Sequence, residues 1–224
     1  MSRHYVITIS RQFGTGGREI GKALGAALGV PVYDRELLEE AARTYCIPVS
    51  VMERNDETAP SRVLESFALS APSLSMLTGA VDYSTIVTSD TTFAWQSATI
   101  RRLAKEGPCV IIGRCADYAL ADYPNHLSLF ISAPLEVRIQ RVAQRQNLTP
   151  EKARQLILKT DKRRASYYEY YSSKKWGSVD SYHFCIDSSY LGLGRTVELI
   201  QAMVAHKEHP IPSPTEEDPT RPRT

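Results

Sequence analysis

The chain has 224 residues, of which 42% are hydrophobic and 23% are charged, a composition that suits one compact α/β domain. Its 27 Lys and Arg residues nearly balance 25 Asp and Glu residues, and the formal net charge is only +2. So small a charge excludes the strong basic field that drives non-specific binding to nucleic acids, although local arginines can still bind a small anion.

Five apolar segments bounded by turn residues predict strands that are buried on both faces of a sheet. They are residues 5–10, 32–33, 109–112, 127–131 and 183–186. Segments of helical periodicity lie between them, one from Ile20 to Leu28 and another following Pro134. Strands that alternate with helices indicate an α/β fold with a mostly parallel sheet and helices on both faces.

Three stretches depart from this alternation. Residues 47–99 are rich in Ser, Thr, Ala and Pro with weak periodicity, which predicts a helical excursion over the edge of the sheet. Thr149 is an expected N-cap for a long polar helix that runs toward Tyr171. The tail, residues 206–224, is rich in Pro and charge and is expected to be disordered. We therefore expect a single domain over residues 1–205.

Several protein classes are disfavoured by what the sequence lacks. It contains no run of the roughly 20 apolar residues that a membrane helix needs, and its first residues lead directly into a strand pattern, unlike a signal peptide. We expect a cytoplasmic protein without a membrane partner, whose four cysteines, lacking a C-x-x-C pair, stay reduced. The five histidines lack metal-ligand spacing and no G-x-S-x-G motif is present, which argues against zinc and hydrolase sites.

A glycine-rich segment, Gly14-Thr15-Gly16-Gly17, joins the first predicted strand to the first predicted helix. Glycines at this position let backbone N–H groups approach a phosphate, and the helix N-terminus adds a favourable dipole. Two alignments to the phosphate-loop pattern compete, because the residues from Gly16 to Lys22 also fit G-x-x-x-x-G-K.

The length of the following helix favours one alignment. If the helix began at Lys22 and ended near Gly29, it would have only about two turns and would be too short to cover the sheet. We therefore expect the helix to begin near Gly17 or Arg18 and to carry Lys22 on its outer face. In this alignment Gly17 stands where the pattern has lysine, and Arg18 is a candidate for the missing positive charge.

The chain resembles the cytidylate kinase-like family, which is a family of P-loop nucleoside monophosphate kinases, in five segments over roughly its first 205 residues. In chain order they are SRQFGTGGREIGKAL, GVPVYDRELL, CVIIGRCADYAL, DKRRASYY and CIDSSYLGL. The resemblance implies a P-loop three-layer fold with a five-stranded parallel sheet, a helical monophosphate-binding excursion and a mobile lid at about residues 145–175. It also implies ATP as phosphoryl donor and Mg²⁺ as cofactor.

The resemblance also suggests roles for individual residues. The expected ATP-binding residues are Gly14, Thr15, Gly16, Gly17, Arg18 and Asp187. The expected acceptor-binding residues are Asp34, Arg114, Asp117 and Asp161, and the arginines expected to act in phosphoryl transfer are Arg18, Arg163 and Arg164. The chain departs from the family pattern on the acceptor side, with Arg35 in place of a serine and Cys115 in place of an aspartate. No Mg²⁺ ligand or oligomeric state is assigned.

Other interpretations of these residues stay open. Asp34 and Asp161 could be helix caps or ion-pair partners, and Arg18 could be a solvated first-turn residue. The basic run that ends in Arg163 and Arg164 could be a solvated helix face or a nucleic-acid patch. The aromatic residues from Tyr167 onward could stack on a base, although packing of the lid helix against the body is the favoured interpretation.

The sequence thus predicts ATP-dependent phosphoryl transfer to a nucleoside monophosphate of the CMP type, with small-molecule nucleotides and no nucleic acid as partners. Phosphoryl transfer depends mainly on positioning and on neutralising charge, which arginines converging on one site can provide. Two alternatives are kept. Gly17 in place of lysine is compatible with a nucleotide-binding module that no longer catalyses, and the departures at Arg35 and Cys115 are compatible with a different small-molecule acceptor.

Overall fold

The computed structural model of the protein describes residues 5–60 and 87–208. The strands are β1 (Val6–Arg11), β2 (Val32–Tyr33), β3 (Cys109–Ile112), β4 (His126–Ser132) and β5 (Phe184–Asp187). The helices are α1 (Gly17–Leu28), α2 (Glu36–Tyr45), α3 (Val49–Arg54), α6 (Ser89–Glu106), α7 (Ala116–Ala119), α8 (Leu135–Gln146), α9 (Pro150–Ser172) and α10 (Ser188–Glu208). Part of the expected excursion, residues 61–86, and the tail after Glu208 lie outside the described residues.

The five strands form one parallel sheet, as expected, and their order in the sheet is β2-β3-β1-β4-β5. Each observed strand lies within a residue of the predicted segment, because uninterrupted apolar runs fit strands that are covered on both faces. The central strand β1 pairs with β3 on one side and with β4 on the other. All five carboxyl ends therefore lie at one edge of the sheet.

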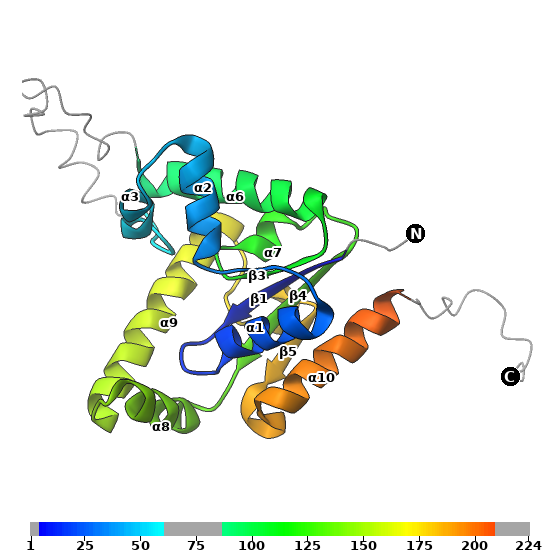
Figure 1. Ribbon diagram of the computed structural model, residues 1–224. Helices are drawn as coiled ribbons and strands as arrows, with labels where there is room; N and C mark the ends of the chain where they lie inside the picture. Colours follow the sequence, from blue (N-terminus) through cyan, green and yellow to red (C-terminus); the bar gives the residue numbers. More distant parts are fainter. Residues whose placement is uncertain (1–4, 61–86, 209–224) are drawn as a thin grey trace, which may run out of the picture.

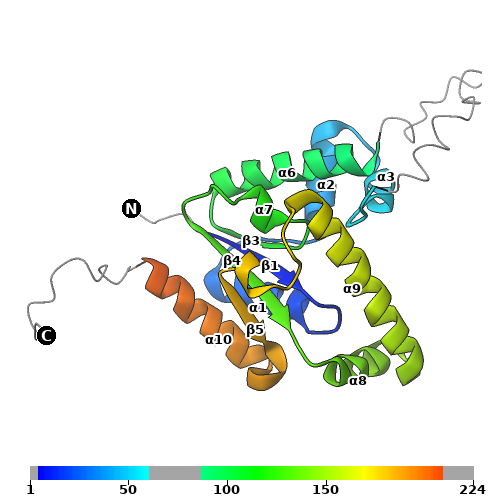
Figure 2. The ribbon, with the colours of Figure 1, turned by 180° about the vertical axis from the view of Figure 1, so that it is seen from behind.

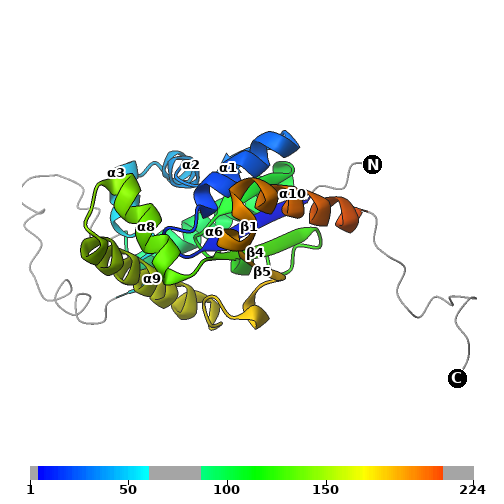
Figure 3. The same cartoon turned by 90° about the horizontal axis from the view of Figure 1, so that it is seen from below.

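Helices cover both faces of the sheet, which gives three layers (Figures 1, 2 and 3). Helices α1 and α10 pack on one face around Ile20, Leu24 and Ile200. Helices α6 and α7 cover the other face through Ile100, Leu103 and the residues of α7. Because α1 follows β1 and α7 follows the neighbouring β3, the chain leaves adjacent strands toward opposite faces, an arrangement that opens a ligand crevice at the carboxyl edge.

Helix α9 runs along this carboxyl edge, and its last turns pack beside α6 and α7 (Figure 2). It begins at Pro150 with the Thr149 side chain accepting a hydrogen bond from the Lys152 amide, as predicted. Near its end, Tyr167 and Tyr168 are buried in an aromatic cluster with Phe130, Tyr182, Phe93, Tyr171 and Trp176. This confirms that the aromatic run packs the helix against the body.

Helix α10 continues to Glu208 across a kink at Gly192, and its last three residues lie beyond the boundary proposed at residue 205. All four cysteines lie in the described residues, and none forms a disulfide. Within residues 5–60 and 87–208, no helix is long and apolar enough to cross a membrane.

Candidate active site

The glycine-rich loop connects β1 to α1 at the carboxyl edge of the sheet. Gly14 and Gly16 have φ angles of 84° and 82°, in the left-handed region that favours glycine. Helix α1 begins at Gly17 and ends before Gly29, whose φ is 66°. This confirms the predicted start and length of the helix and leaves Lys22 exposed on its outer face.

The loop leaves backbone donors available for an anion. The amides of Gly16, Arg18 and Glu19 donate hydrogen bonds to no other described residue, and the N-cap of α1 receives no side-chain hydrogen bond. Unpartnered amides at a helix N-terminus, together with the helix dipole, bind phosphate groups. The loop residues Gly14, Thr15, Gly16 and Gly17 thus fit the phosphate chain of a nucleotide.

A buried ion pair supports this loop from behind. Asp161 of α9 accepts a hydrogen bond from the Phe13 amide at 2.7 Å and pairs with Arg138 of α8 at 2.6 Å. Arg138 also donates to the carbonyl oxygens of Phe13 and Ala133. We call Arg138 and Asp161 the loop brace. Asp161, expected at the acceptor, here positions the loop.

The start of α10 contacts the loop from the other side. The Ser188 hydroxyl donates to the carbonyl oxygen of Thr15 at 2.7 Å, and Arg141 donates to the same oxygen at 3.1 Å. The Asp187 carboxylate accepts hydrogen bonds from the Ser189 hydroxyl and amide, which lower its pKa below the usual range. Asp187 is exposed one residue from the loop contact, at the edge of the predicted nucleotide site.

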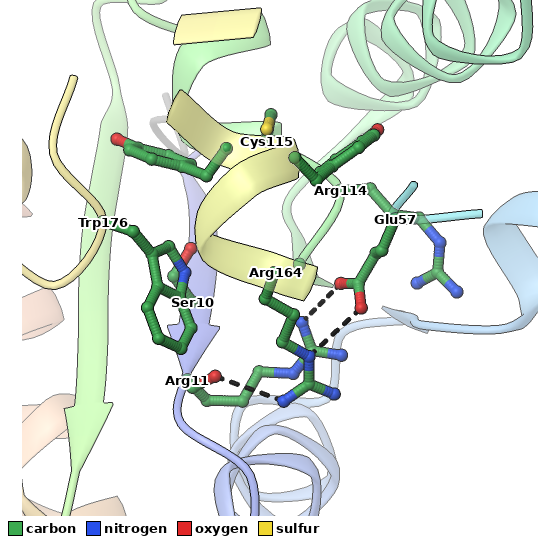
Figure 4. A pocket seen from close by; sticks show the side chains of 10 residues that line it. Ser10, Arg11, Glu57, Arg114, Cys115, Arg164 and Trp176 are labelled. Atoms are coloured by element: carbon green, nitrogen blue, oxygen red, sulfur yellow. Dashed lines mark hydrogen bonds and ion pairs between the residues drawn. The ribbon is translucent and has the colours of Figure 1, made fainter. Parts of the chain in front are cut away.

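Arginines converge on a small cavity at the carboxyl ends of β1 and β3. Arg114, which follows β3, is only 6% exposed; it donates to Asp34 at 3.2 Å and twice to Asp56, at 3.0 and 3.1 Å. Arg11 at the end of β1 and Arg164 of α9 both donate to Glu57, at 3.0 and 3.1 Å (Figure 4).

Arg18 joins this group from the loop through an ion pair with Asp34. We call the whole set the pocket cluster: the guanidinium groups of Arg11, Arg18, Arg114 and Arg164 and the carboxylates of Asp34, Asp56 and Glu57. With all three carboxylates ionised it holds one positive charge more than negative charges. The sequence predicted a role here for Arg18, Asp34, Arg114 and Arg164, and the structure brings all four together.

The pKa shifts in the pocket cluster reflect burial and crowding of charge. Burial opposes ionisation of Glu57, but the neighbouring Arg11 and Arg164 hold its pKa well below the usual range. Burial and the adjacent Arg11 guanidinium both lower the pKa of Arg164. Two guanidinium groups that face one carboxylate would be stabilised by a further anion, which a phosphate group can provide.

Arg163 lies outside the pocket cluster. Its side chain is exposed on α9, and it forms no ion pair with another residue of the described ranges. Arg164, one position later, is turned inward and makes a cation–π contact with Phe13, with its guanidinium carbon 5.8 Å from the ring centre. The catalytic role of Arg163 stays a prediction that this arrangement does not favour.

Asp117 lies behind the pocket, where its carboxylate accepts a hydrogen bond from the Tyr168 hydroxyl at 2.8 Å. Its other oxygen is buried without a hydrogen-bond partner among the described residues. Burial raises the pKa of Asp117 to about 6. Cys115 lines the cavity itself, whereas Arg35 is exposed and pairs with Glu53. The two departures from the family pattern therefore differ in access to the site.

Sequence reasoning missed five charged residues at the site. They are Arg11, Asp56, Glu57, Arg138 and Arg141. Asp56 and Glu57 follow α3 in the weakly periodic excursion, where no pattern fixes the direction of a side chain. Arg11 had a usable signal, because it stands at the first glycine of G-x-x-x-x-G-K once Gly17 is taken as the start of the helix.

Guanidinium groups predominate among the charged groups that line the cavity, and they suit an anion. Residues 5–60 and 87–208 contain no cluster of three or more His, Cys, Asp or Glu side chains suited to a metal. Mg²⁺ bound with a nucleotide takes most of its ligands from phosphates and water and needs only one or two carboxylates. This arrangement is therefore compatible with Mg²⁺ that arrives with ATP.

Comparison with solved structures finds the same fold in other proteins. An uncharacterised protein from Eubacterium ventriosum has a TM-score of 0.67 and 25% sequence identity, over 91% of this chain and 99% of that chain. Shikimate kinase from Bacteroides thetaiotaomicron has a TM-score of 0.50 and 14% identity, over 90% of this chain and 98% of that chain. At this identity the second match shows a shared fold alone.

Comparison with known sequences identifies the family. A cytidylate kinase from Methanopyrus kandleri is 28% identical over an alignment of 112 positions. The alignment covers 46% of this chain and 58% of that protein, so less than two thirds of the relative is covered. The family model described as the cytidylate kinase-like family matches residues 6–190, which include the glycine loop, the pocket cluster and α9. The chain therefore belongs to the cytidylate kinase-like family.

Proposed function

We propose that the protein transfers a phosphoryl group from ATP to a nucleoside monophosphate of the CMP type. Family and fold support a kinase-like phosphotransferase. The observation that carries the proposal is that an anion-binding loop and an arginine-rich cavity share the carboxyl ends of the adjacent strands β1 and β3. In-line transfer between two phosphate groups needs this juxtaposition.

On the donor side, the loop amides and the α1 N-terminus hold the phosphate chain. Gly14 and Gly16 keep the backbone in left-handed conformations, and loops of this kind can present successive N–H groups to one anion. The loop brace and Ser188 fix the loop at Phe13 and Thr15, so that the loop does not have to be ordered when the nucleotide binds. When bound, ATP supplies the phosphoryl group and Mg²⁺ neutralises charge on its phosphates.

On the acceptor side, Arg114 is the principal phosphate ligand. Its guanidinium is buried, and Asp34 and Asp56 fix its orientation. By displacing one of these carboxylates from the guanidinium, the acceptor phosphate can be aligned with the donor loop. Asp34 also pairs with Arg18, and it therefore connects the acceptor side to the first turn of α1.

Helix α9 supplies the third side of the site. Arg164 reaches the cavity from α9 and donates to both Glu57 and the carbonyl oxygen of Arg11. A guanidinium in this position can neutralise charge on the transferring phosphoryl group, which is the largest contribution that a protein makes to this reaction.

A coupled assay of ADP release with ATP and Mg²⁺ tests the proposal. The acceptors should be CMP, dCMP, UMP, AMP and GMP, each with its nucleoside as matched control. We expect turnover with at least one pyrimidine monophosphate and none with the corresponding nucleoside. Binding of ATP without turnover on any acceptor would instead support a nucleotide-binding module.

One observation favours a second candidate, a kinase for an acceptor that lacks a phosphate. Each arginine of the pocket cluster is already paired with a carboxylate, and an acceptor phosphate has to compete with Asp56 and Glu57 for these partners. A neutral hydroxyl acceptor would not compete with them. Faster ADP release with nucleosides or sugars than with the monophosphates would select this candidate.

A further inference from the structure

The loop of this chain carries a reciprocal exchange of two side chains relative to the pattern G-x-x-x-x-G-K-[ST]. Because α1 begins at Gly17, Gly16 occupies the second glycine of the pattern. Arg11 then occupies the position of the first glycine of the pattern, and Gly17 occupies the position of its lysine. The protein has lost a cation at one position of the loop and gained one six residues earlier.

In space, these two positions are neighbours. A Cβ atom added to Gly17 would lie 2.7 Å from Cβ and 3.0 Å from Cγ of Arg11. The stem of Arg11 therefore fills the space in which a side chain at position 17 would begin. Arg11 and a lysine at position 17 exclude each other without a shift of the backbone.

A second glycine accommodates the other end of the same side chain. A Cβ atom added to Gly113, which has a φ of 78°, would overlap Nη1 of Arg11. Gly17 and Gly113 therefore leave a passage from the loop to the cavity, and the Arg11 side chain fills it. Figure 4 shows Arg11 and Arg164 reaching the same part of the cavity beside Glu57.

Charge pairing alone does not account for Arg11. Glu57 is also paired with Arg164 at 3.1 Å, so it would keep a cationic partner without Arg11. Arg11, which also lies 3.9 Å from the Asp34 carboxylate, is one of the four guanidinium groups that outnumber the three carboxylates of the pocket cluster by one. Its side chain is only 11% exposed, and a buried surplus charge is costly unless a ligand neutralises it.

We propose that Arg11 binds the terminal phosphate groups of the donor nucleotide in place of the P-loop lysine. Gly17 and Gly113 are the glycines that allow its side chain to reach the cavity. The inference rests on the proposed function, because it requires that the loop binds a nucleoside triphosphate. It assigns the missing cation to β1, whereas the sequence alone pointed to Arg18.

The first test compares Arg11→Met with Arg11→Lys, because both keep an unbranched stem between the glycines and only lysine keeps the charge. Calorimetry without acceptor should measure the dissociation constants of ATP and AMP, with Lys22→Ala as control. We expect Arg11→Met to weaken ATP binding about 10- to 100-fold, which is the usual effect of losing a hydrogen bond to a charged group. The dissociation constant of AMP should stay almost unchanged. Arg11→Lys should stay within about 10-fold of wild type.

The second test restores the usual pattern. Gly17→Lys alone should weaken ATP binding because its side chain collides with Arg11, whereas the double variant Arg11→Gly, Gly17→Lys should recover most of the lost affinity. Melting temperatures of the unliganded proteins show which variants fold. If the double variant does not fold, the comparison of Arg11→Met with Arg11→Lys still tests the role of Arg11.

The outcomes separate the two proposals. If wild type and Arg11→Met bind ATP equally well, or if Arg11→Met weakens AMP and ATP binding alike, the assignment of Arg11 is wrong and the proposed function stands. The assignment of Arg11 is also wrong, and the proposed function still stands, if the double variant folds but binds ATP no better than Gly17→Lys. If wild type binds no ATP at all, both proposals are wrong.

Discussion

The loop brace and the pocket cluster are both built from Arg and carboxylate pairs that are mostly buried, but the two differ in their balance of charge. In the loop brace, Arg138 and Asp161 form one balanced pair, and their other hydrogen bonds go to the backbone of Phe13 and Ala133. In the pocket cluster, four guanidinium groups face three carboxylates beside a cavity. A balanced pair that is bonded to backbone positions a loop, whereas a surplus of one sign beside a cavity is suited to a ligand.

The largest effect should come from the pocket cluster. Arg164→Ala should lower kcat by about 10³-fold while changing the ATP dissociation constant only a few-fold, because charge on the transferring group develops in the transition state. Steady-state kinetics on the acceptor found by the ADP-release screen, with calorimetry for ATP, would measure both quantities.

Arg163→Ala is the matched control, because Arg163 is adjacent on α9 and exposed. The structure leads us to expect near-normal kcat for this variant, whereas the sequence assigned it a catalytic role. An equally large loss of kcat in Arg163→Ala would show that α9 turns this side chain into the site when both nucleotides bind.

Breaking the loop brace should act on stability first. Asp161→Ala leaves the buried Arg138 without its partner, and we expect the free energy of unfolding to fall by about 3 kcal/mol. Urea denaturation followed by circular dichroism would measure it. Asp161→Asn, which keeps an acceptor for the Phe13 amide, should lose less. A loss below about 1 kcal/mol in Asp161→Ala would mean that the pair does not support the loop.

Replacing Asp117 should raise stability at neutral pH, whereas replacing Asp161 should lower it. The pKa of Asp117 is about 6 in the folded protein against 3.8 for an unperturbed aspartate, so the folded state holds the proton more tightly. Its contribution to stability is present below about pH 4 and is lost as the pH rises to 6, by at most about 3 kcal/mol. Asp117→Asn should therefore raise the melting temperature at pH 7 relative to wild type, and this gain should disappear near pH 4. A difference between the two proteins that is independent of pH would contradict the raised pKa.

The fold was readable from the sequence because its elements are local. Buried parallel strands appear as uninterrupted apolar runs, and the spacing between Gly17 and Gly29 fixed the limits of α1. Contacts between distant segments were not readable. The partners of Arg114 and Arg164 are Asp56 and Glu57, which follow α3 in a stretch without clear periodicity.

The same limit explains the reassignment of Asp161. Its place in a charged run that resembles a lid signature indicated a ligand contact, but its partners are Phe13 and Arg138, 148 and 23 residues away. Local sequence shows that a charged residue is present, whereas the topology decides whether its partner is protein or ligand.

The smallest expected effect concerns Arg18, which belongs to the pocket cluster through its ion pair with Asp34. Its side chain is 54% exposed, and ion pairs of exposed groups contribute little because water and salt screen them. We therefore expect Arg18→Ala to weaken ATP binding only a few-fold, with a larger effect at low ionic strength than at high ionic strength. Lys22→Ala should change nothing at either ionic strength, because Lys22 lies on the outer face of α1. Calorimetric titration of ATP at two salt concentrations would measure both variants against wild type. A greater loss of affinity in Lys22→Ala than in Arg18→Ala would mean that the phosphates bind one turn further along the helix, and the alignment that places Arg11 at the first glycine would then be wrong as well.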